Sequence, residues 1–434
     1  MTTLSTVAKQ QGIKYFMVSF TDLRGVQRAK LVPAAAIDRI AVEGAGFAGF
    51  ATWLDMTPAD ADVLAMAEPS SLIQLPWKPE VAWVASHLVM NGKVVEQSPR
   101  WVLQRQIQRA KERGLTARTG VECEYFVLGA DGESVSDARD VQSKPCYDQH
   151  ALTRRYDLIS AICDNMLALG WAPYQNDHED ANGQFEMNWT YSDALRTADR
   201  HTFFKYMVKT LAEAQGLRAT FMPKPFAHLS GNGCHVHVSM WDAETEQNLF
   251  RDAKGDLGLS SMAYQFMGGV MHHAEALCAI TNPTVNSYKR INGAPTLSGA
   301  TWSPNTVSYT GNNRTHMIRI PDVDRFELRL ADGATNPYLL QAALIAAGLD
   351  GIANQRDCGK RRDNNQYVDP LPPEEARRLP TNLLDAVRAL RADRELAMAL
   401  GAPFVDAFTK LKEHEWAEHQ AQISPWERAA TLDC

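Results

Sequence analysis

The first hundred residues alternate between short apolar runs and turn signals. Residues 15–20 form a mixed apolar run, residues 22–25 read Asp-Leu-Arg-Gly, and alternation of apolar and polar positions returns over residues 26–32. Two such runs joined by a short turn predict a β-hairpin in a strand-rich region.

A long helix is predicted to begin at Ser98. This serine is a favourable N-cap residue, and Pro99 occupies the first helical position. Because the strand-rich pattern ends here, we place a domain boundary just before the helix. The chain is thereby divided into an N-terminal domain, residues 1–97, and a larger domain, residues 98–434.

Strand patterns and long helical patterns are mixed over the rest of the chain. Helical spacing of apolar residues occurs over residues 152–169, 194–215, 262–280, 337–352, 383–400 and 403–422. Strand patterns occur over residues 116–128, 185–191, 233–240, 317–320 and 325–330. This mixture predicts an α+β fold.

Composition and charge narrow the class of protein. Of the 434 residues, 45% are hydrophobic and 22% are charged, which is typical of a globular protein, and the net charge is −7. A negative chain with one short basic run, at residues 359–362, argues against a nucleic-acid partner.

The most apolar helical segment, residues 338–352, is too short to span a membrane. Seven scattered cysteines without a CxxC pair, and no secretory signal in residues 1–10, favour a cytoplasmic protein with reduced thiols.

Three of the predicted strands carry charged or polar side chains on a face where apolar residues would be expected. A period of two places the members of each set on one face. The sets are Glu122 and Glu124 in the first strand, His235, His237 and Ser239 in the second, and Arg325, Glu327 and Arg329 in the third. The two glutamates of the first strand lie roughly 6.5 Å apart, so each could serve a different metal ion of a paired site.

These polar faces have two interpretations. Taken singly, each strand is better explained as an antiparallel strand whose polar side faces water. Together, the strands supply the carboxylates, imidazoles and guanidinium groups that a divalent cation and a polyphosphate need. Mg²⁺ and Mn²⁺ take oxygen ligands, Mn²⁺ also accepts imidazole, and arginines neutralise a transferring phosphoryl group. The joint pattern therefore favours a metal and polyphosphate site.

An acidic segment at residues 177–186 fits the same chemistry. Glu179 and Glu186 flank a glycine-containing turn, so both could point into one site, although by composition the segment is also an ordinary acidic loop. The sequence contains neither a Walker A loop nor a GxGxxG motif after a strand. If ATP binds, it binds outside the P-loop and Rossmann modes.

At these residues the chain resembles the glutamine synthetase family over almost its full length. The matching segments follow the order of the family: residues 121–126, 178–186, 221–225, 231–237, 286–290, 313–321 and 325–329. The resemblance implies an N-terminal β-grasp domain and a large catalytic domain with a curved antiparallel sheet. It also implies a homo-oligomer, a dodecamer of two hexameric rings with active sites between subunits.

The resemblance further implies a role for each matching residue. One metal ion is assigned to Glu124, Glu179 and Glu186, and a second to Glu122, His235 and Glu327. The glutamate substrate is assigned to Gly231, Arg290 and Arg329, and the nucleotide to His237 and Ser239. The phosphates of ATP are assigned to Arg314, Arg319 and Arg325. Arg314 and Arg319, with Glu179, would be the catalytic residues, and the cofactors would be ATP and two to three Mg²⁺ or Mn²⁺ ions.

The implied reaction has two steps. The γ-carboxylate of L-glutamate attacks the γ-phosphate of ATP, which gives γ-glutamyl phosphate and ADP. Ammonia or a small amine then displaces the phosphate. Positioning and charge neutralisation are the main contributions of a protein to phosphoryl transfer of this kind.

Two departures from the family pattern concern the amine. Ammonia-using members carry an Asp in a Phe-Asp-Gly stretch of the N-terminal domain and a Glu in a flexible flap. Ala48 occupies the first of these places, and the flap segment, residues 291–298, has no acid. Tyr147 is still available as the family's ammonium-site tyrosine. Loss of two carboxylates removes the charge that selects a small cation and leaves apolar room.

We therefore expect a small alkylamine acceptor, methylamine first, as in γ-glutamylmethylamide synthetase and the related type III glutamine synthetases. Ammonia remains the alternative if another acid, such as Asp55, Asp60 or Asp62, replaces the one missing at Ala48. A larger amine, such as a polyamine, is a further alternative. A non-catalytic ring-forming relative is disfavoured because all six metal positions and the phosphate arginines are intact.

Overall fold

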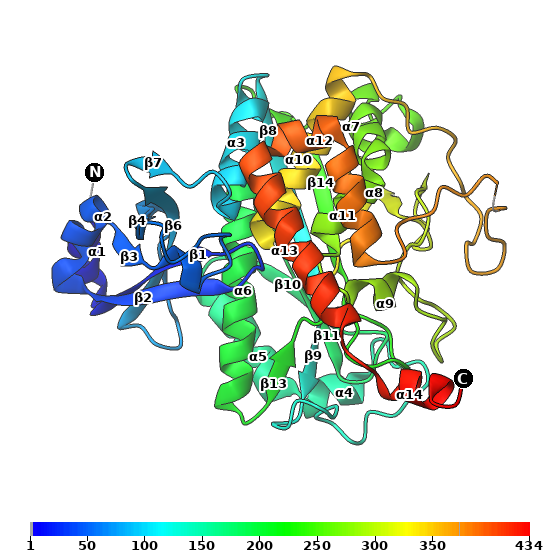
Figure 1. Ribbon diagram of the computed structural model, residues 1–434, viewed down its shortest axis with the longest axis horizontal. Coiled ribbons are helices and arrows are strands. Elements are labelled where there is room, and N and C mark those ends of the chain that lie inside the picture. The colour runs from blue at the N-terminus through cyan, green and yellow to red at the C-terminus, as the bar shows by residue number, and fades with distance from the viewer. Residues whose placement is uncertain (1–2, 373) are drawn as a thin grey trace.

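The computed structural model describes residues 3–372 and 374–434. Figure 1 shows a smaller N-terminal part, drawn in blue, beside a larger body of helices and sheets. The N-terminal helices are α1 (Leu4–Gln11) and α2 (Ile37–Glu43), with the short 3-10 turns η1 (Ala34–Ala36), η2 (Gly49–Ala51) and η3 (Pro69–Ser71). The N-terminal strands are β1 (Tyr15–Thr21), β2 (Gln27–Pro33), β3 (Ala45–Phe47), β4 (Val63–Ala67), β5 (Ile73–Gln74), β6 (Val81–Met90) and β7 (Lys93–Val94).

The N-terminal strands form one sheet in the order β2-β1-β6-β4-β3, and β5 and β7 also pair with β6. Strands β1 and β2 are an antiparallel hairpin with Tyr15 opposite Pro33, so the predicted hairpin is confirmed. Strands β1 and β6 are parallel at the centre of the sheet, and α2 packs near β4. This arrangement agrees with the expected β-grasp fold.

Strand β6 joins the N-terminal sheet to the rest of the molecule. One face of it, with Val84 and Leu88, lies in the N-terminal core, and the other, with Trp83 and Ala85, lies in the large core. Alternation of side chains along a strand makes this sharing possible. Helix α3 (Pro99–Lys111) begins at the proline that marked the expected helix start, and the domain boundary between residues 97 and 98 stays a prediction.

Two sheets form the centre of the larger body. The first has the order β12-β8-β14-β17-β16-β15 and is antiparallel except for the pair β15 and β16, and the second has the order β10-β11-β9-β13. The strands of the first sheet are β8 (Leu115–Cys123), β12 (Ser192–Asp193), β14 (Cys234–Asp242), β15 (Tyr309–Thr310), β16 (Ile318–Asp322) and β17 (Arg325–Leu328). Those of the second are β9 (Tyr125–Leu128), β10 (Pro173–His178), β11 (Gln184–Trp189) and β13 (Arg218–Thr220). The predicted α+β fold is confirmed.

The prediction of one strand over residues 116–128 is wrong. It is interrupted at Glu124, which lies between β8 and β9, and the two strands belong to different sheets. The Glu124 carboxylate accepts a hydrogen bond from the Gly233 N–H, and the Glu124 N–H donates to the Gly233 carbonyl. These bonds fix the chain where it passes from one sheet to the other.

Helices cover the sheets of the larger body (Figure 1). They are α4 (Gln149–Arg154), α5 (Tyr156–Ala168), α6 (Ala194–Ala214), α7 (Ser261–His272), α8 (Ala274–Thr281), α9 (Ser287–Ile291), α10 (Pro337–Ala353), α11 (Leu383–Ala392), α12 (Arg394–Leu400), α13 (Ala402–Gln420) and α14 (Pro425–Thr431), with the 3-10 turn η4 (Asp256–Gly258). The predicted helices over residues 194–215, 337–352 and 403–422 correspond closely to α6, α10 and α13.

Three predicted long helices are each divided into two. Residues 152–169 form α4 and α5, residues 262–280 form α7 and α8, and residues 383–400 form α11 and α12. The break between α7 and α8 is at His273, whose ring bonds to both Asp350 and Asp393. Apolar spacing continues through each break, so the sequence pattern alone could not show it. No helix within the described residues is both long and apolar enough to cross a membrane.

Candidate active site

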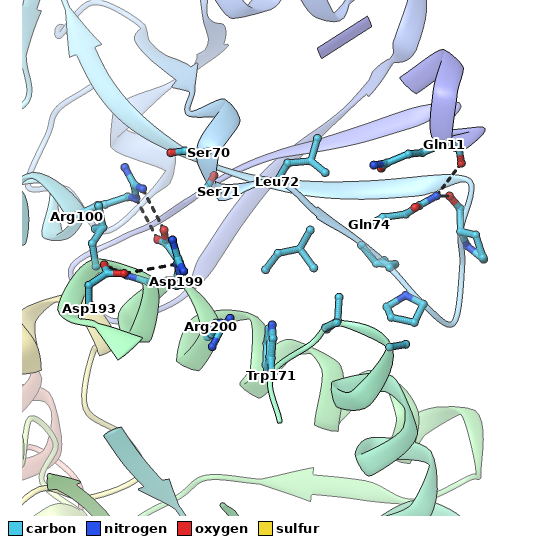
Figure 2. A pocket seen from close by; sticks show the side chains of 18 residues that line it. Gln11, Ser70, Ser71, Leu72, Gln74, Arg100, Trp171, Asp193, Asp199 and Arg200 are labelled. Atoms are coloured by element: carbon cyan, nitrogen blue, oxygen red, sulfur yellow. Dashed lines mark hydrogen bonds and ion pairs between the residues drawn. The ribbon is translucent and has the colours of Figure 1, made fainter. Parts of the chain in front are cut away.

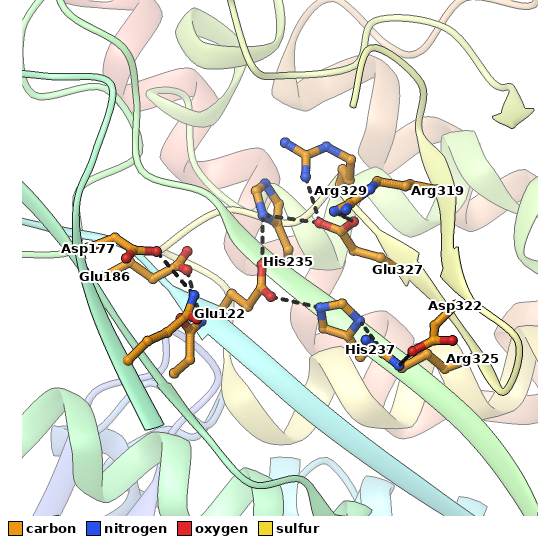
Figure 3. Close-up of polar contacts among 12 residues, drawn as sticks. Glu122, Asp177, Glu186, His235, His237, Arg319, Asp322, Arg325, Glu327 and Arg329 are labelled. Carbon is orange, nitrogen blue, oxygen red and sulfur yellow. Dashed lines mark hydrogen bonds and ion pairs between the residues drawn. The ribbon is translucent and has the colours of Figure 1, made fainter. Parts of the chain in front are cut away.

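Adjacent antiparallel strands bring the predicted metal ligands together. Register pairs His235 of β14 with Glu122 of β8, and β17 places Glu327 on the other side of β14. His235 Nδ1 lies 3.5 Å from Glu122 Oε2 and 3.5 Å from Glu327 Oε1. Figure 3 shows these three side chains pointing toward one another. The structure thus brings together the residues assigned to one metal ion.

The other predicted ligands lie beside this group. Glu124, Glu186 and His235 have ligand atoms within 4.8 Å of one another, and so do Asp177, Glu179 and Glu186. Glu186 therefore belongs to both acidic groups and links them. The family pattern had placed Glu124, Glu179 and Glu186 on one ion, and the structure has them in two overlapping clusters of one site.

Asp177 is a member of this site to which no role was assigned from the sequence. It lies on β10 two residues before Glu179 and lines the same cavity. Spacing by two along a strand places side chains on one face, and this was the signal that could have identified it.

The polar faces of strands β8, β14 and β17 do not point into water, so the interpretation of each as an ordinary water-facing strand is wrong. Glu327 is 0% exposed, His235 is 5% exposed and Glu186 is 6% exposed. Buried charges are stable only when they are paired or bind an ion. The polar faces of β8, β14 and β17 therefore enclose a site.

The acidic side of the site has unbalanced negative charge. Burial, together with the nearby Glu124 and Asp177 carboxylates, raises the pKa of Glu179 to about 8. Burial and the charges of Glu122 and Glu179 raise the pKa of Glu186 well above its usual value. These carboxylates repel one another, and neither Glu179 nor Glu186 forms an ion pair with an arginine or lysine in the part of the chain that the structure describes.

On the opposite side of the site, formed by β8, β14 and β17, the negative charges of the carboxylates are balanced by nearby arginines and histidines. Burial alone would raise the pKa of Glu327, but Arg329 and His235 outweigh it and lower that pKa to about 2. Arg329 Nη1 donates to Glu327 Oε1 at 2.6 Å, and Arg319 Nη1 donates to Glu327 Oε2 at 2.8 Å. In the same way, His235 and His237 outweigh burial and lower the pKa of Glu122.

These residues fit a hard divalent cation. Several carboxylates and one imidazole converge, which is the donor set that Mg²⁺ and Mn²⁺ accept. His235 Nε2 is buried and has no hydrogen-bond partner among the described residues. An ion in the acidic cluster would relieve the repulsion that raises the two pKa values.

Arginines border the same cavity, which has a volume of about 280 Å³. Four of them line it: Arg314, Arg319, Arg325 and Arg329. Arg325 Nε donates to His237 Nδ1 at 3.3 Å, so His237 Nε2 carries the hydrogen that bonds to Glu122 Oε1 at 2.9 Å. The phosphate and substrate roles expected for these four arginines stay predictions.

An adjoining cavity of about 340 Å³ shares residues with the first. Glu122, His237 and Arg325 line both cavities, and Ser239 lines only the second. Ser239 Oγ accepts a hydrogen bond from the Trp241 indole N–H. The predicted nucleotide residues His237 and Ser239 thus lie together next to the metal cluster.

Of the residues expected to hold glutamate, Gly231 and Arg329 line the first cavity, and Arg290 does not. Gly231 lines the first cavity, and a Cβ there would lie 2.3 Å from the Pro223 carbonyl oxygen and 3.1 Å from Arg290 Cγ. Arg290 is buried and donates to the Leu330 carbonyl. A glycine is therefore required where the chain passes Arg290.

Tyr147 lines the first cavity from a loop. Its backbone has a left-handed φ of 64°, and its N–H donates to the His178 carbonyl at 2.8 Å. Burial and the nearby Glu179 raise the pKa of the Tyr147 phenol. Tyr147 thus lies near Glu179 in the cavity lining, and its expected amine-binding role stays a prediction.

Ala48 is not brought to this site within one chain. It is exposed in the N-terminal sheet, just before η2, and does not line either cavity. The flap segment lies closer, because Ser298 Oγ donates to Asp180 Oδ2 at 2.6 Å and Asp180 lines the first cavity.

Comparisons with known proteins agree with this geometry. Residues 96–431 match the family model described as glutamine synthetase, catalytic domain. A "Glutamine synthetase" of Rhizobium leguminosarum bv. phaseoli is 60% identical over 99% of both chains. A "Glutamate--methylamine ligase" of Methyloversatilis universalis is 43% identical over 98% of this chain and 97% of its own. A solved structure described as "GmaS/ADP complex-Conformation 1" is 60% identical over 100% of both chains, with a TM-score of 0.97. The chain belongs to the glutamine synthetase family, whose members use ATP and divalent metal ions.

Proposed function

We propose that this protein joins the γ-carboxyl group of L-glutamate to a small amine with ATP as the energy source, and that methylamine is the favoured acceptor. The observation that carries the proposal is the single cavity in which the buried carboxylates and His235 face four arginines. Such a site can hold both a metal-bound polyphosphate and a carboxylate substrate.

Two to three Mg²⁺ or Mn²⁺ ions would be held by Glu122, Glu124, Glu179, Glu186, His235 and Glu327, and when bound they neutralise phosphate oxygens. His237, Ser239 and Arg325 orient the nucleotide in the adjoining cavity. Arg290, Arg329 and Gly231 hold glutamate so that a γ-carboxylate oxygen points at the γ-phosphorus. Arg314 and Arg319 meet the charge that develops as that oxygen bonds to phosphorus and ADP leaves.

The second step uses the other end of the cavity. The amine nitrogen attacks the γ-carbon of γ-glutamyl phosphate, inorganic phosphate leaves, and the nitrogen loses a proton. Tyr147 binds the amine, and Glu179 lies in the same cavity to accept that proton. The contact of Ser298 with Asp180 supports closure of the flap, which protects the acyl phosphate from water.

The identity of the amine rests on the missing acids. Ala48 and the acid-free flap favour an alkylamine, as do the relatives named glutamate–methylamine ligase and GmaS, γ-glutamylmethylamide synthetase. Ammonia is the second candidate, because relatives named glutamine synthetase are 60% and 59% identical, compared with 43% for the glutamate–methylamine ligase and 60% for GmaS. Asp180, a buried carboxylate in the cavity, could supply the missing negative charge.

We also propose a ring-shaped homo-oligomer, a dodecamer, with active sites between subunits. Ala48 is exposed and lines neither cavity of the site in its own chain, which supports a place for it beside the site of a neighbouring subunit. A cytoplasmic location fits the seven cysteines, each of which is unpaired in the part of the chain that the structure describes.

The decisive measurement is ADP release with glutamate, ATP and Mg²⁺, and with methylamine, ammonium, ethylamine or putrescine as acceptor. We expect kcat/KM for methylamine to exceed that for ammonium by roughly tenfold or more, which corresponds to about 1.4 kcal/mol. Preference for ammonium would make the protein a glutamine synthetase in the strict sense, and no turnover with any amine would contradict a catalytic role.

A variant tests the reason for the preference. Ala48→Asp is expected to shift the ratio of the two kcat/KM values toward ammonium. Ala51→Asp is the matched control, because it adds the same charge to an exposed alanine three residues away. Equal effects of the two variants, or no effect of either, would contradict the role of Ala48.

A further inference from the structure

A second large cavity lies where the N-terminal sheet meets the larger body. Its volume is about 630 Å³, and its walls come from residues 70–76 on one side and from α5, α6 and the chain between them on the other. Figure 2 shows Ser70, Leu72 and Gln74 facing Trp171 and Arg200 across this space. None of its lining residues lines the candidate active site. We call it the junction cavity.

One wall of the junction cavity contains a buried arginine with unused hydrogen-bonding capacity. Arg100 is 3% exposed, and its Nε and Nη2 atoms donate to the two oxygens of Asp199 at 3.1 and 3.0 Å. The Tyr338 hydroxyl donates to the same carboxylate. Arg100 Nη1 is buried and has no acceptor among the described residues. An unpaired buried N–H is costly, but its burial closes this atom off from the cavity, so Arg100 and Asp199 act as a fixed part of the wall.

A second arginine of this wall has no carboxylate partner within the described chain. Arg200 is half-buried and lies over the Trp171 ring, 5.5 Å from its centroid. Arg196, one turn earlier on α6, pairs with Asp193 at 3.5 Å. Burial and the charge of Arg196 both lower the pKa of Arg200. An anion beside Arg200 would therefore be attracted by an unneutralised charge.

The remaining lining sets the size and polarity of the ligand. Three arginines and two aspartates line the cavity, which leaves an excess of one positive charge. Apolar side chains form much of the rest of the wall: Leu72, Leu75, Leu169, Trp171 and Leu195. Pockets of this size at the junction of two parts of a chain are common sites for small molecules.

We propose that the junction cavity binds a small organic acid with one carboxylate and an apolar body. The carboxylate accepts from Arg200, and the apolar body packs on Trp171 and the neighbouring leucines. Because both the N-terminal sheet and α5–α6 contribute walls, the bound acid also fixes the position of the N-terminal sheet. This site is independent of the proposed ligase reaction.

The test is calorimetric titration of the full-length protein with benzoate and with 3-methylbutanoate. Saturating ADP and Mg²⁺ are present so that the catalytic arginines are occupied, and benzamide serves as the uncharged probe. The wild-type protein is expected to bind both acids and not benzamide. Arg200→Gln should weaken binding at least tenfold, while Arg196→Gln, on the same helix but already paired, should change it less than threefold. Arg100 is left intact because its ion pair with Asp199 is buried.

A second variant blocks the space without altering charge. Ala168 is an exposed lining residue at the end of α5, and Ala168→Trp should abolish binding of both acids. Failure of both acids to bind the wild-type protein would overturn the proposal. It would also be overturned if Arg200→Gln and Ala168→Trp bound as tightly as the wild type, or if Arg196→Gln weakened binding as much as Arg200→Gln.

Discussion

The two sides of the candidate active site use the same residue type in opposite ways. On the β17 side, Glu327 is held between Arg319 and Arg329, and its pKa is lowered to about 2. On the β10–β11 side, Glu179 and Glu186 face other carboxylates, and burial and repulsion raise their pKa values. One side is neutralised by the protein itself, and the other can be neutralised only by cations that bind there.

The comparison shows how the site can be assembled in stages. The β8–β14–β17 side needs no ion to hold its side chains in place, because its charges are paired across neighbouring strands. On the acidic side, the carboxylates repel one another in the folded chain, and a divalent ion bound between them would relieve this repulsion. Affinity for the metal thus comes partly from repulsion already present in the folded chain.

The largest effect is expected from Glu327→Ala on the balanced side. It leaves Arg319 and Arg329 without their shared buried carboxylate, which should cost about 3–5 kcal/mol of unfolding free energy. The ADP-releasing activity should fall by roughly 10³-fold or more, because Arg319, expected at the phosphates, and Arg329, expected at the glutamate substrate, lose their orientation. Urea unfolding and steady-state kinetics measure the two effects.

Asp322→Ala is the control for stability. Asp322 pairs with Arg325 at the exposed edge of the same sheet, and such a pair contributes about 0–1 kcal/mol. If the two variants lost equal stability, the charges of the balanced side would not be coupled as the structure indicates.

An intermediate effect is expected from Glu186→Gln on the acidic side. Without divalent ions the variant should be more stable than the wild type, because one of the repelling carboxylates is removed. With Mg²⁺ or Mn²⁺ at 100 times its Kd, the wild type should gain about 2.7 kcal/mol, and the variant should gain clearly less. Thermal unfolding in chelator and in metal compares the two.

Glu244→Gln, a change at an exposed position outside the site, is the matched control and should change neither quantity. A metal-free Glu186→Gln protein that is less stable than the wild type would contradict the repulsion on this side.

The smallest effect per step of the experiment is expected from pH in the metal-free protein, taken one pH unit at a time. Glu179 and Glu186 bind protons more tightly in the folded state than in the unfolded chain, whose glutamates titrate near 4.5. The unfolding free energy should therefore fall as pH rises from about 4.5 to about 8, by up to about 1.4 kcal/mol per pH unit for each proton released. Urea midpoints in chelator across this range measure the slope.

Saturating Mg²⁺ should flatten this slope above neutral pH, since the ion replaces the protons. Above about pH 5.5 the balanced side contributes little, because Glu122 and Glu327 are ionised in the folded protein and glutamates of the unfolded chain are then almost fully ionised as well. If the unfolding free energy changed with pH by the same amount with and without metal, groups outside the site would be the cause of the change.

Sequence reasoning identified most of the site because its chemistry is carried by local patterns. Alternation placed His235 and His237 on one face of a strand, and the same period placed Glu327 between Arg325 and Arg329. The structure confirms that the polar faces meet, because β8, β14 and β17 are neighbours in one sheet. Asp177 was present in the same acidic segment, and its spacing by two from Glu179 was a signal that the sequence analysis did not use because it treated the segment as a loop.

Other features depended on contacts between distant segments. The break at Glu124 exists because Gly233, more than a hundred residues later, bonds to its backbone and side chain. The break at His273 is fixed by Asp350 and Asp393, which approach from other helices. Apolar periodicity contains no information on such partners, so it predicted one long element in each case.

By itself, the sequence determined the α+β class, the N-terminal hairpin and the residue types that can bind a metal ion and a polyphosphate. Local period and turn chemistry are enough for these features. Only the tertiary structure decided which carboxylates are paired with arginines and which repel one another, and only it revealed the junction cavity with Arg100 and Arg200 in its wall. Charge state and cavity shape depend on neighbours in space, and those neighbours are supplied by strand register and by the packing of the N-terminal sheet on α5 and α6.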